Sequence, residues 1–219
     1  MTEIFNRAMH ARMTRTSVLA AAKPRRAKGA KQIARREDVA RAAFAVIARG
    51  GLERTSMRAI AHEMECSTGV LTHHFRDKAE LIKFTLDVLL DQLVVQMSDA
   101  AEMKGADPLQ RIILSLLPND PESELRWRVI LSVTAASMNE PSLQDDQERR
   151  ETAIQEWYVN LLARMRDRGV VRKDVNLVLE ADCISSFVDG LAMHTILSPE
   201  RFGRARQAKM VARYLQAIT

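Results

Sequence analysis

The chain has 219 residues, of which 47% are hydrophobic, so it is long enough to bury a core in two small domains or one large one. It contains no apolar run of membrane-spanning length, which excludes a transmembrane helix and predicts no membrane partner. The two cysteines, Cys66 and Cys183, form no C-x-x-C pair, and no Cys/His cluster has metal-ligand spacing. This composition suits the cytoplasm and predicts neither a disulfide framework nor a metal or cofactor site.

The positive charge is concentrated at the N-terminus. Residues 1–36 contain ten Lys or Arg and one acidic residue, so the remainder is net acidic although the whole chain carries +5. Residues 1–30 show no sustained hydrophobic period, which predicts a mobile basic arm that could lie along DNA phosphates or in a minor groove. A solvated tail and a targeting peptide are the alternatives. The candidate DNA contacts of this stretch are Arg25, Arg26, Lys28, Lys31, Arg35 and Arg36.

A helical hydrophobic period begins at residue 31 and continues to residue 49. Gly50 and Gly51 follow and are typical of a helix end. We expect this helix to cover the back of the next two elements. Its apolar stripe consists of Ile33, Ala40, Ala43, Phe44 and Ile47.

The pattern of residues 55–75 predicts two short helices joined by a tight turn, as in a helix-turn-helix. Either Thr55 or Ser56 can cap the first helix, and Ser67 can cap the second. The turn, at Glu65 or Cys66, is expected to need a residue in the left-handed region, which costs a non-glycine side chain about 1 kcal/mol. An ordinary helical hairpin is the alternative interpretation.

The second of these helices has a slim, polar outward side. Ser67, Thr68, Thr72 and His73 are short hydrogen-bonding side chains that can reach base edges in a major groove. Since this side has no Arg or Lys, specificity is expected to depend on hydroxyls, thymine methyls and DNA shape. Gly69 either permits a close approach to DNA or relieves packing within the protein.

The rest of the chain is helical by pattern. Asp77 and Glu80 are spaced to cap a long helix that reaches about residue 103, and Lys78 in its first turn is either a phosphate contact or a solvated lysine. Asp174 is expected to cap the helix that ends at Leu197. Further helices are predicted over residues 108–117, 122–139, 141–169 and 204–218. The prediction is an all-α protein of about nine helices, with an arm (1–30), a helix-turn-helix domain (31–76) and a larger helical domain (77–219).

The residues from Thr55 to Leu81 resemble the TetR/AcrR family of transcriptional repressors, through the pattern Ser-x-Gly-x-x-x-His-x-Phe-x-x-Lys-x-x-Leu that starts at Ser67. Trp127-Arg128, residues 189–192 and residues 198–202 resemble the C-terminal domain of the BetI-type branch. This resemblance implies an all-α homodimer whose last two helices pair across the two-fold axis. It also implies a small-molecule effector that binds the C-terminal domain and releases the double-stranded DNA operator.

The resemblance assigns DNA contacts by position. Ser67, Thr68, Gly69 and Thr72 are expected to face bases or the groove backbone. Thr55, His73, His74 and Lys78 are expected to contact phosphates. Ser56 and Arg58 complete the predicted DNA-binding set.

Six residues of the second half are candidates for an effector pocket, although each also fits an ordinary core. If their aromatic rings converge, they favour a cationic or quaternary ammonium effector through cation–π contact. No nucleophile–base pair or phosphate-binding glycine loop is present, and the sequence predicts no catalytic residue. The favoured function is a ligand-responsive transcriptional regulator, and the alternatives are a helical enzyme and a helical interaction protein that does not bind DNA. The pocket candidates are Trp127, Met138, Trp157, Tyr158, Met193 and His194.

Overall fold

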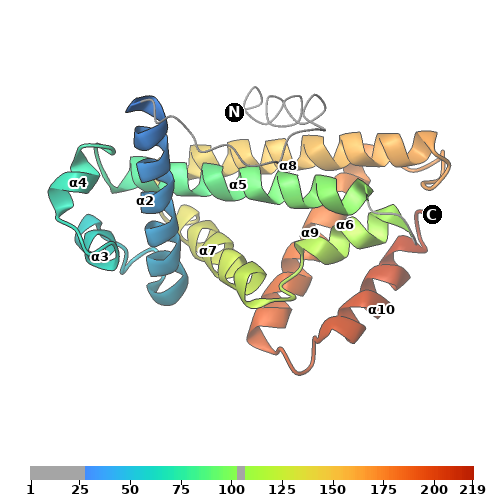
Figure 1. Ribbon diagram of the computed structural model, residues 1–219. Coiled ribbons are helices and arrows are strands. Elements are labelled where there is room, and N and C mark those ends of the chain that lie inside the picture. Colours follow the sequence, from blue (N-terminus) through green and yellow to red (C-terminus); the bar gives the residue numbers. More distant parts are fainter. Residues whose placement is uncertain (1–27, 103–106) are drawn as a thin grey trace, which may run out of the picture. The chain divides into compact units, whose positions relative to one another are not determined.

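The computed structural model describes residues 28–102 and 107–219, and within these ranges the chain forms nine helices and no strand (Figure 1). The all-α prediction is confirmed. None of the described helices is long and apolar enough to cross a membrane. The helices are α2 (Lys28–Gly50), α3 (Met57–Glu63), α4 (Thr68–Thr72), α5 (Lys78–Glu102), α6 (Pro108–Leu116), α7 (Pro121–Ser137), α8 (Pro141–Asp167), α9 (Leu177–Leu197) and α10 (Arg204–Leu215).

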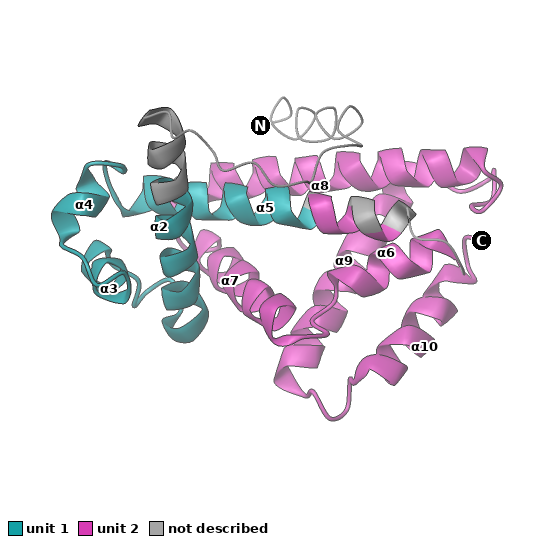
Figure 2. Cartoon of the chain, viewed as in Figure 1, with its two compact units in different colours: residues 1–94 teal, residues 95–219 magenta. Residues whose placement is uncertain are grey.

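The chain divides into two compact units, residues 1–94 and residues 95–219 (Figure 2). The division falls inside α5, whereas the sequence suggested a boundary at residues 76 and 77. The difference arises because the first turns of α5 belong to the core of unit 1. Leu81 is fully buried there, and Phe84 packs against the same cluster.

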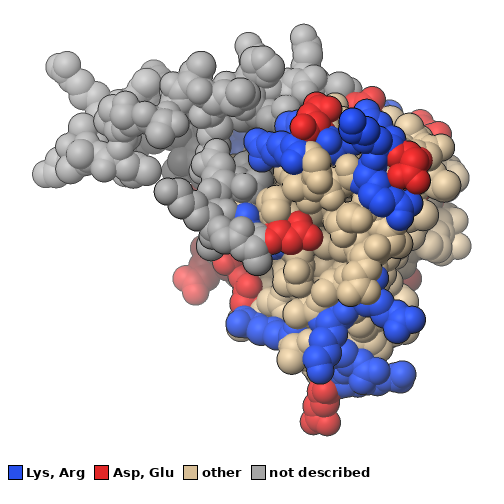
Figure 3. Space-filling model, turned by 90° about the vertical axis from the view of Figure 1, so that its right-hand side faces the viewer, with Lys and Arg blue, Asp and Glu red and all other residues tan. Residues whose placement is uncertain are grey.

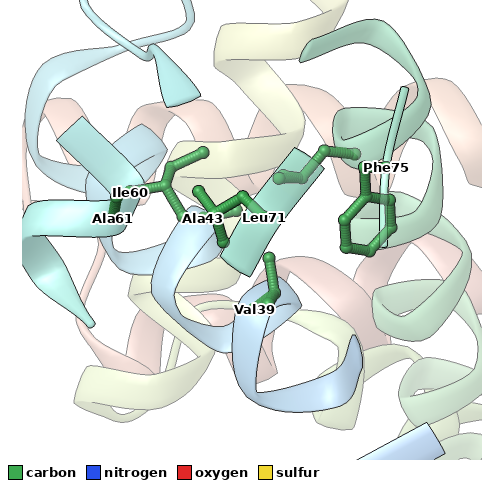
Figure 4. Packing of buried hydrophobic residues seen from close by; sticks show 7 residues of the cluster. Val39, Ala43, Ile60, Ala61, Leu71 and Phe75 are labelled. Carbon is green, nitrogen blue, oxygen red and sulfur yellow. The ribbon is translucent and has the colours of Figure 1, made fainter. Parts of the chain in front are cut away.

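Unit 1 is held together by a small apolar cluster contributed by α2, α3, α4 and the start of α5 (Figure 4). Ala61 on α3 is 3% exposed and leaves room for α4, as a short turn between two crossing helices requires. The cluster fixes which side of α4 faces inward, so the opposite side faces solvent. Its members are Val39, Ala43, Ile60, Ala61, Leu71, Phe75 and Leu81.

Unit 2 packs α8 against α9, with α7 contacting both and α10 contacting α6. Helix α6 buries Leu109, Ile112, Ile113 and Leu116. Trp127 on α7 is buried and donates its Nε1–H to the carbonyl of Leu116 at 2.7 Å, which satisfies the indole while its ring fills the core.

Side-chain caps begin several of the helices, and one predicted cap needs correction. Asp107 and Asp120 cap α6 and α7, each followed by proline at the first helical position. The predicted cap Asp174 is wrong: Asn176 caps α9, its carboxamide oxygen accepting the N–H groups of Val178 and Leu179, both at 3.2 Å. Asp174 instead accepts hydrogen bonds from the Arg172 guanidinium.

Candidate nucleic-acid interface

Helices α3 and α4 form the predicted helix-turn-helix. Ser56 is the N-cap of α3, and its hydroxyl accepts the N–H of Ala59 at 3.1 Å. The turn is closed by the N–H of Cys66, which donates to the carbonyl of Ala61 at 3.0 Å. Glu65 has a φ of 51°, so the expected left-handed residue is confirmed at this position. The turn therefore stores backbone strain that glycine would avoid.

Helix α4 presents its polar side outward. Ser67, Thr68, Thr72 and His73 are exposed, whereas Leu71 on the opposite side is fully buried. His74 is partly buried, and its ring lies 5.1 Å from that of His73 in an edge-to-face arrangement. The structure thus brings the predicted base-reading side chains together on one accessible side of one helix.

The hydroxyls of α4 differ in what they can offer a ligand. Ser67 is the N-cap by backbone conformation, but its hydroxyl makes no capping hydrogen bond. Thr72 donates its hydroxyl proton to the carbonyl of Gly69 at 3.2 Å, which leaves its oxygen lone pairs and its methyl group for an outside partner. In a major groove such a hydroxyl can accept a hydrogen bond from a base amino group, and the methyl group can pack on the methyl of thymine.

Among the residues that the structure describes, none gives Gly69 a packing reason. A Cβ built there would meet only the Ser67 hydroxyl, at an ordinary 3.7 Å, and the residue is exposed. Packing relief therefore does not explain this glycine. Because glycine costs about 1 kcal/mol of helix propensity, a close approach by a molecule outside the chain remains the better explanation.

Two expected phosphate contacts are engaged within unit 1. Thr55 is 2% exposed, and its hydroxyl donates to the carbonyl of Gly51 at 2.8 Å, so its side chain does not face outward. Lys78 donates from Nζ to the carbonyl of Leu52 at 2.9 Å, across 26 residues of sequence. It is therefore not simply a solvated lysine, although two of its three protons remain for another acceptor.

A basic surface lies beside α3. An open hollow is lined by Arg49, Arg54, Ser56, Arg58, His62 and Glu63, among others. The hydrogen bond and ion pair with Arg49 lower the pKa of Glu63, so this carboxylate is already neutralised by its partner. The hollow therefore carries the positive charges of Arg54 and Arg58. The sequence interpretation did not include Arg54. It stands two residues before Ser56 and four before Arg58, so its closeness to the start of α3 was the available signal.

The predicted basic arm is only partly described. Arg25 and Arg26 lie outside the described residues, and so does most of the arm itself. Lys28, Lys31 and Arg35 belong to α2, which begins three residues earlier than the hydrophobic period indicated. Arg36 also lies on α2, with its guanidinium packed against the rings of Phe75 and Phe84.

The six pocket candidates of unit 2 differ in burial. Trp127, Trp157 and Tyr158 are buried, and the last two contact each other edge to face, with ring centroids 5.2 Å apart. Met138 is 78% exposed at the end of α7, and Met193 is 38% exposed on α9. His194 is exposed and stacks on the ring of Phe202.

The sequence interpretation missed Asp189, on α9. Partial burial of the carboxyl group, followed by the nearby carboxylate of Glu151 on α8, raises the pKa of Asp189 to about 6, although the residue as a whole is exposed. Burial and the charge of Asp189 together raise the pKa of the buried Tyr158 hydroxyl. The available signal was a carboxylate set among the small and apolar residues Val188, Gly190 and Leu191 of α9.

The fold and these positions define a helix-turn-helix DNA-binding protein with a second, larger helical unit. Residues 27–83 match the bacterial regulatory proteins of the tetR family, and residues 105–219 match the BetI-type transcriptional repressor C-terminal family. The chain belongs to the TetR family, with a BetI-type C-terminal domain. Its family identifies it as a transcriptional regulator rather than an enzyme.

Individual relatives agree with this assignment. The regulator PksA of Bacillus subtilis (strain 168) is 26% identical over 186 residues, covering 84% of this chain and 89% of its own. The regulator BetI of Yersinia pestis (strain Pestoides F) is also 26% identical, covering 83% and 91%. A transcriptional regulator from Saccharomonospora viridis, solved in complex with choline, has the same fold with a TM-score of 0.71 and 19% identity, covering 85% and 99%.

Proposed function

We propose that the protein is a ligand-responsive repressor that binds a palindromic operator as a homodimer and leaves it when a small-molecule effector binds unit 2. Its place of action is the cytoplasm, where the double-stranded operator lies. The DNA-binding half of this proposal is carried by α4, which exposes Ser67, Thr68 and Thr72 around a glycine that nothing in the described chain requires.

Base recognition is assigned to α4, and phosphate binding to its surroundings. The hydroxyls and methyls of α4 suit a readout that depends on thymine methyls and DNA shape. Arg54 and Arg58 beside the hollow, together with the remaining protons of Lys78, supply positive charge for phosphates. Affinity should therefore fall steeply with salt, by a slope of about 0.9 for each phosphate contact.

Replacing Gly69 with alanine tests the DNA proposal. The new methyl group has room in the free protein and raises helix propensity by about 0.5–1 kcal/mol, so Gly69→Ala should be at least as stable as the wild type. Operator affinity should nevertheless fall about tenfold or more, because the methyl group keeps α4 from the groove. Fluorescence anisotropy with an operator selected from random-sequence DNA measures this change.

Gly203→Ala is the matched control, because a Cβ at Gly203 in unit 2 also makes only an ordinary contact, with the Pro199 carbonyl at 3.8 Å. Its operator affinity should equal that of the wild type. Wild-type affinity in Gly69→Ala would show that α4 does not approach DNA closely. Failure of the selection to enrich any sequence would sink the DNA-binding proposal itself.

The homodimer is supported by the outer face of α9. Leu179, Cys183, Ser186, Gly190 and Met193 follow one another at spacings of four and three residues, so they form one stripe on the side away from the core. Leu179 is 60% exposed, and a Cβ at Gly190 would meet nothing within 4 Å. An apolar helix with an exposed stripe and small residues at its centre suits a close crossing with another helix.

The charges of α9 and α10 support a second copy of the chain as the partner. Helix α9 carries three acidic residues and no Lys or Arg, whereas α10 carries four Lys or Arg and no acidic residue. In a two-fold assembly each α9 can face the partner's α10, so the same surface supplies both charges. Figure 3 shows a face of the molecule on which a mostly uncharged area separates two groups of Lys and Arg, each with Asp or Glu beside it.

The effector is assigned a positive charge. Asp189 lies near the buried Tyr158 hydroxyl and also near the carboxylate of Glu151, so a cation would relieve the cost of an ionised Asp189. The choline-bound relative supports the same chemistry by likeness of fold. Isothermal titration with choline-like and polyamine ligands tests it. Binding should be lost in Asp189→Asn and kept in Asp182→Asn. If the wild type gives no heat of binding with either ligand class, the assignment of a cationic effector is wrong.

A further inference from the structure

Arg36 belongs to the basic N-terminal region by sequence, but its half-buried side chain packs against the rings of Phe75 and Phe84 in unit 1. It shares one face of α2 with the buried Ala40, Ala43 and Ile47, at spacings of four, three and four residues. Its guanidinium carbon lies 4.8 Å from the centre of the Phe75 ring and 4.6 Å from that of Phe84. The two rings are themselves 5.5 Å apart. The two distances from the guanidinium carbon to the ring centres are within the range of a cation–π contact.

These rings mark the corner between α4 and α5. Phe75 is 1% exposed, and its N–H donates to the carbonyl of Leu71 in α4 at 2.9 Å, so its position is tied to the end of that helix. Phe84 lies on α5, about two turns beyond the cap residue Asp77. The guanidinium of Arg36 thus joins α2 to both helices of the corner through a single flat group.

The same corner contains a polar link. Glu80 accepts the Arg76 N–H at 2.9 Å and the Arg76 Nε–H at 3.1 Å, and its other oxygen lies 4.0 Å from Nη2 of Arg36. Asp77 accepts the N–H of Glu80 at 2.8 Å. The expected cap of α5 is thereby confirmed, with Glu80 reaching back to residue 76. Arg36 completes this arrangement from the α2 side.

We propose that Arg36 is a positioning residue for α4: clamped between Phe75 and Phe84 and paired with Glu80, its guanidinium sets where the recognition helix ends relative to α2. Arginine suits this role because its planar cation can stack on aromatic rings while its edge faces a carboxylate. The proposal rests on the DNA-binding role of α4. It differs from the expectation of a phosphate contact, although both involve the same charge.

Salt dependence separates the two roles. Loss of a phosphate contact lowers the slope of log K against log[salt] by about 0.9, whereas a displaced recognition helix lowers affinity at every salt concentration. In the full-length protein, Arg36→Met should bind the selected operator about tenfold more weakly with an unchanged slope. Arg58→Ala, at the basic hollow, is the reference variant whose slope should fall. A slope lowered by about 0.9 in Arg36→Met would overturn the proposal.

Arg36→Lys keeps the charge but loses the planar group. A positioning role predicts nearly the same loss of affinity as in Arg36→Met, whereas full recovery by lysine would overturn it. The lysine variant also serves if Arg36→Met proves too unstable, as judged by circular dichroism. In a protein that already carries Phe84→Leu, Arg36→Lys should lower operator affinity only about threefold or less, because one ring of the clamp is already absent. A loss of affinity equal to that in the wild-type background would contradict the clamp. Absence of specific binding by the wild type would instead reject the proposed function.

Discussion

Thr55, Lys78 and Arg36 each carry a polar group that a DNA-binding protein could offer to phosphates, and each uses it inside unit 1. The partner of Lys78 is a carbonyl 26 residues away, so no local pattern could reveal it. Arg36 did carry a signal, because it continues the stripe of Ala40 and Ala43 on α2. Charge alone indicates a partner of opposite sign, whereas the helical face decides whether that partner lies inside or outside the protein.

Glu65 is the only described non-glycine residue with a positive φ, and replacing it should stabilise the protein. Glycine removes about 1 kcal/mol of left-handed strain but gains freedom in the unfolded chain, so Glu65→Gly should raise the free energy of unfolding by about 0.5 kcal/mol. Urea denaturation measures the change. Glu53→Gly is the control and should destabilise instead, because Glu53 does not have a positive φ. Equal losses in both variants would contradict the strain.

Asp189 predicts a pH dependence of stability. Burial raises its folded pKa to about 6, above the usual value near 3.9, so the folded state holds the proton more tightly than the unfolded state does. The contribution of this group to stability therefore falls as pH rises from about 4 to 6 and stays at its minimum above that range. Relative to the wild type, Asp189→Asn should gain about 1 kcal/mol across this window, after allowance for solvent screening. Urea unfolding at pH 4, 5, 6 and 7.5, at fixed protein concentration, checks this, and a pH-independent difference would contradict it.

At the scale of elements, hydrophobic period and caps predicted where helices lie, and errors arose at their ends. Helix α3, the start of α4 and the Asp107 cap of α6 followed directly from the sequence. The start of α9 did not, because Asp174 and Asn176 both have capping side chains and only the backbone path chooses between them. Met138 shows the same limit: it continues the apolar pattern of α7 but follows the last buried turn, so it is exposed.

The choice of cap at α9 can be measured. Asn176→Ala should lower the free energy of unfolding by about 1 kcal/mol, because two N–H groups at the helix start lose their acceptor. Asp174→Ala removes only an exposed ion pair with Arg172 and should cost less than half as much. Thermal and urea unfolding of both variants decide the question. A larger loss in Asp174→Ala would mean that the sequence expectation was right.

For the whole molecule, the proposed function requires two copies of α4 to reach one operator together. One subunit presents only a short helix without Arg or Lys, so a single head should bind weakly, and affinity should come from joining two heads. Gly190→Leu tests this, because the added side chain has open space in one chain but would obstruct a crossing of two α9 helices. We expect the variant to sediment as a monomer in analytical ultracentrifugation and to bind a palindromic operator about 100-fold more weakly, with unchanged affinity for a half-site. Gln144→Leu places the same side chain on an exposed position of α8 and should behave as the wild type. If Gly190→Leu remains a dimer with full operator affinity, α9 is not the self-association surface and another face of unit 2 must join the heads.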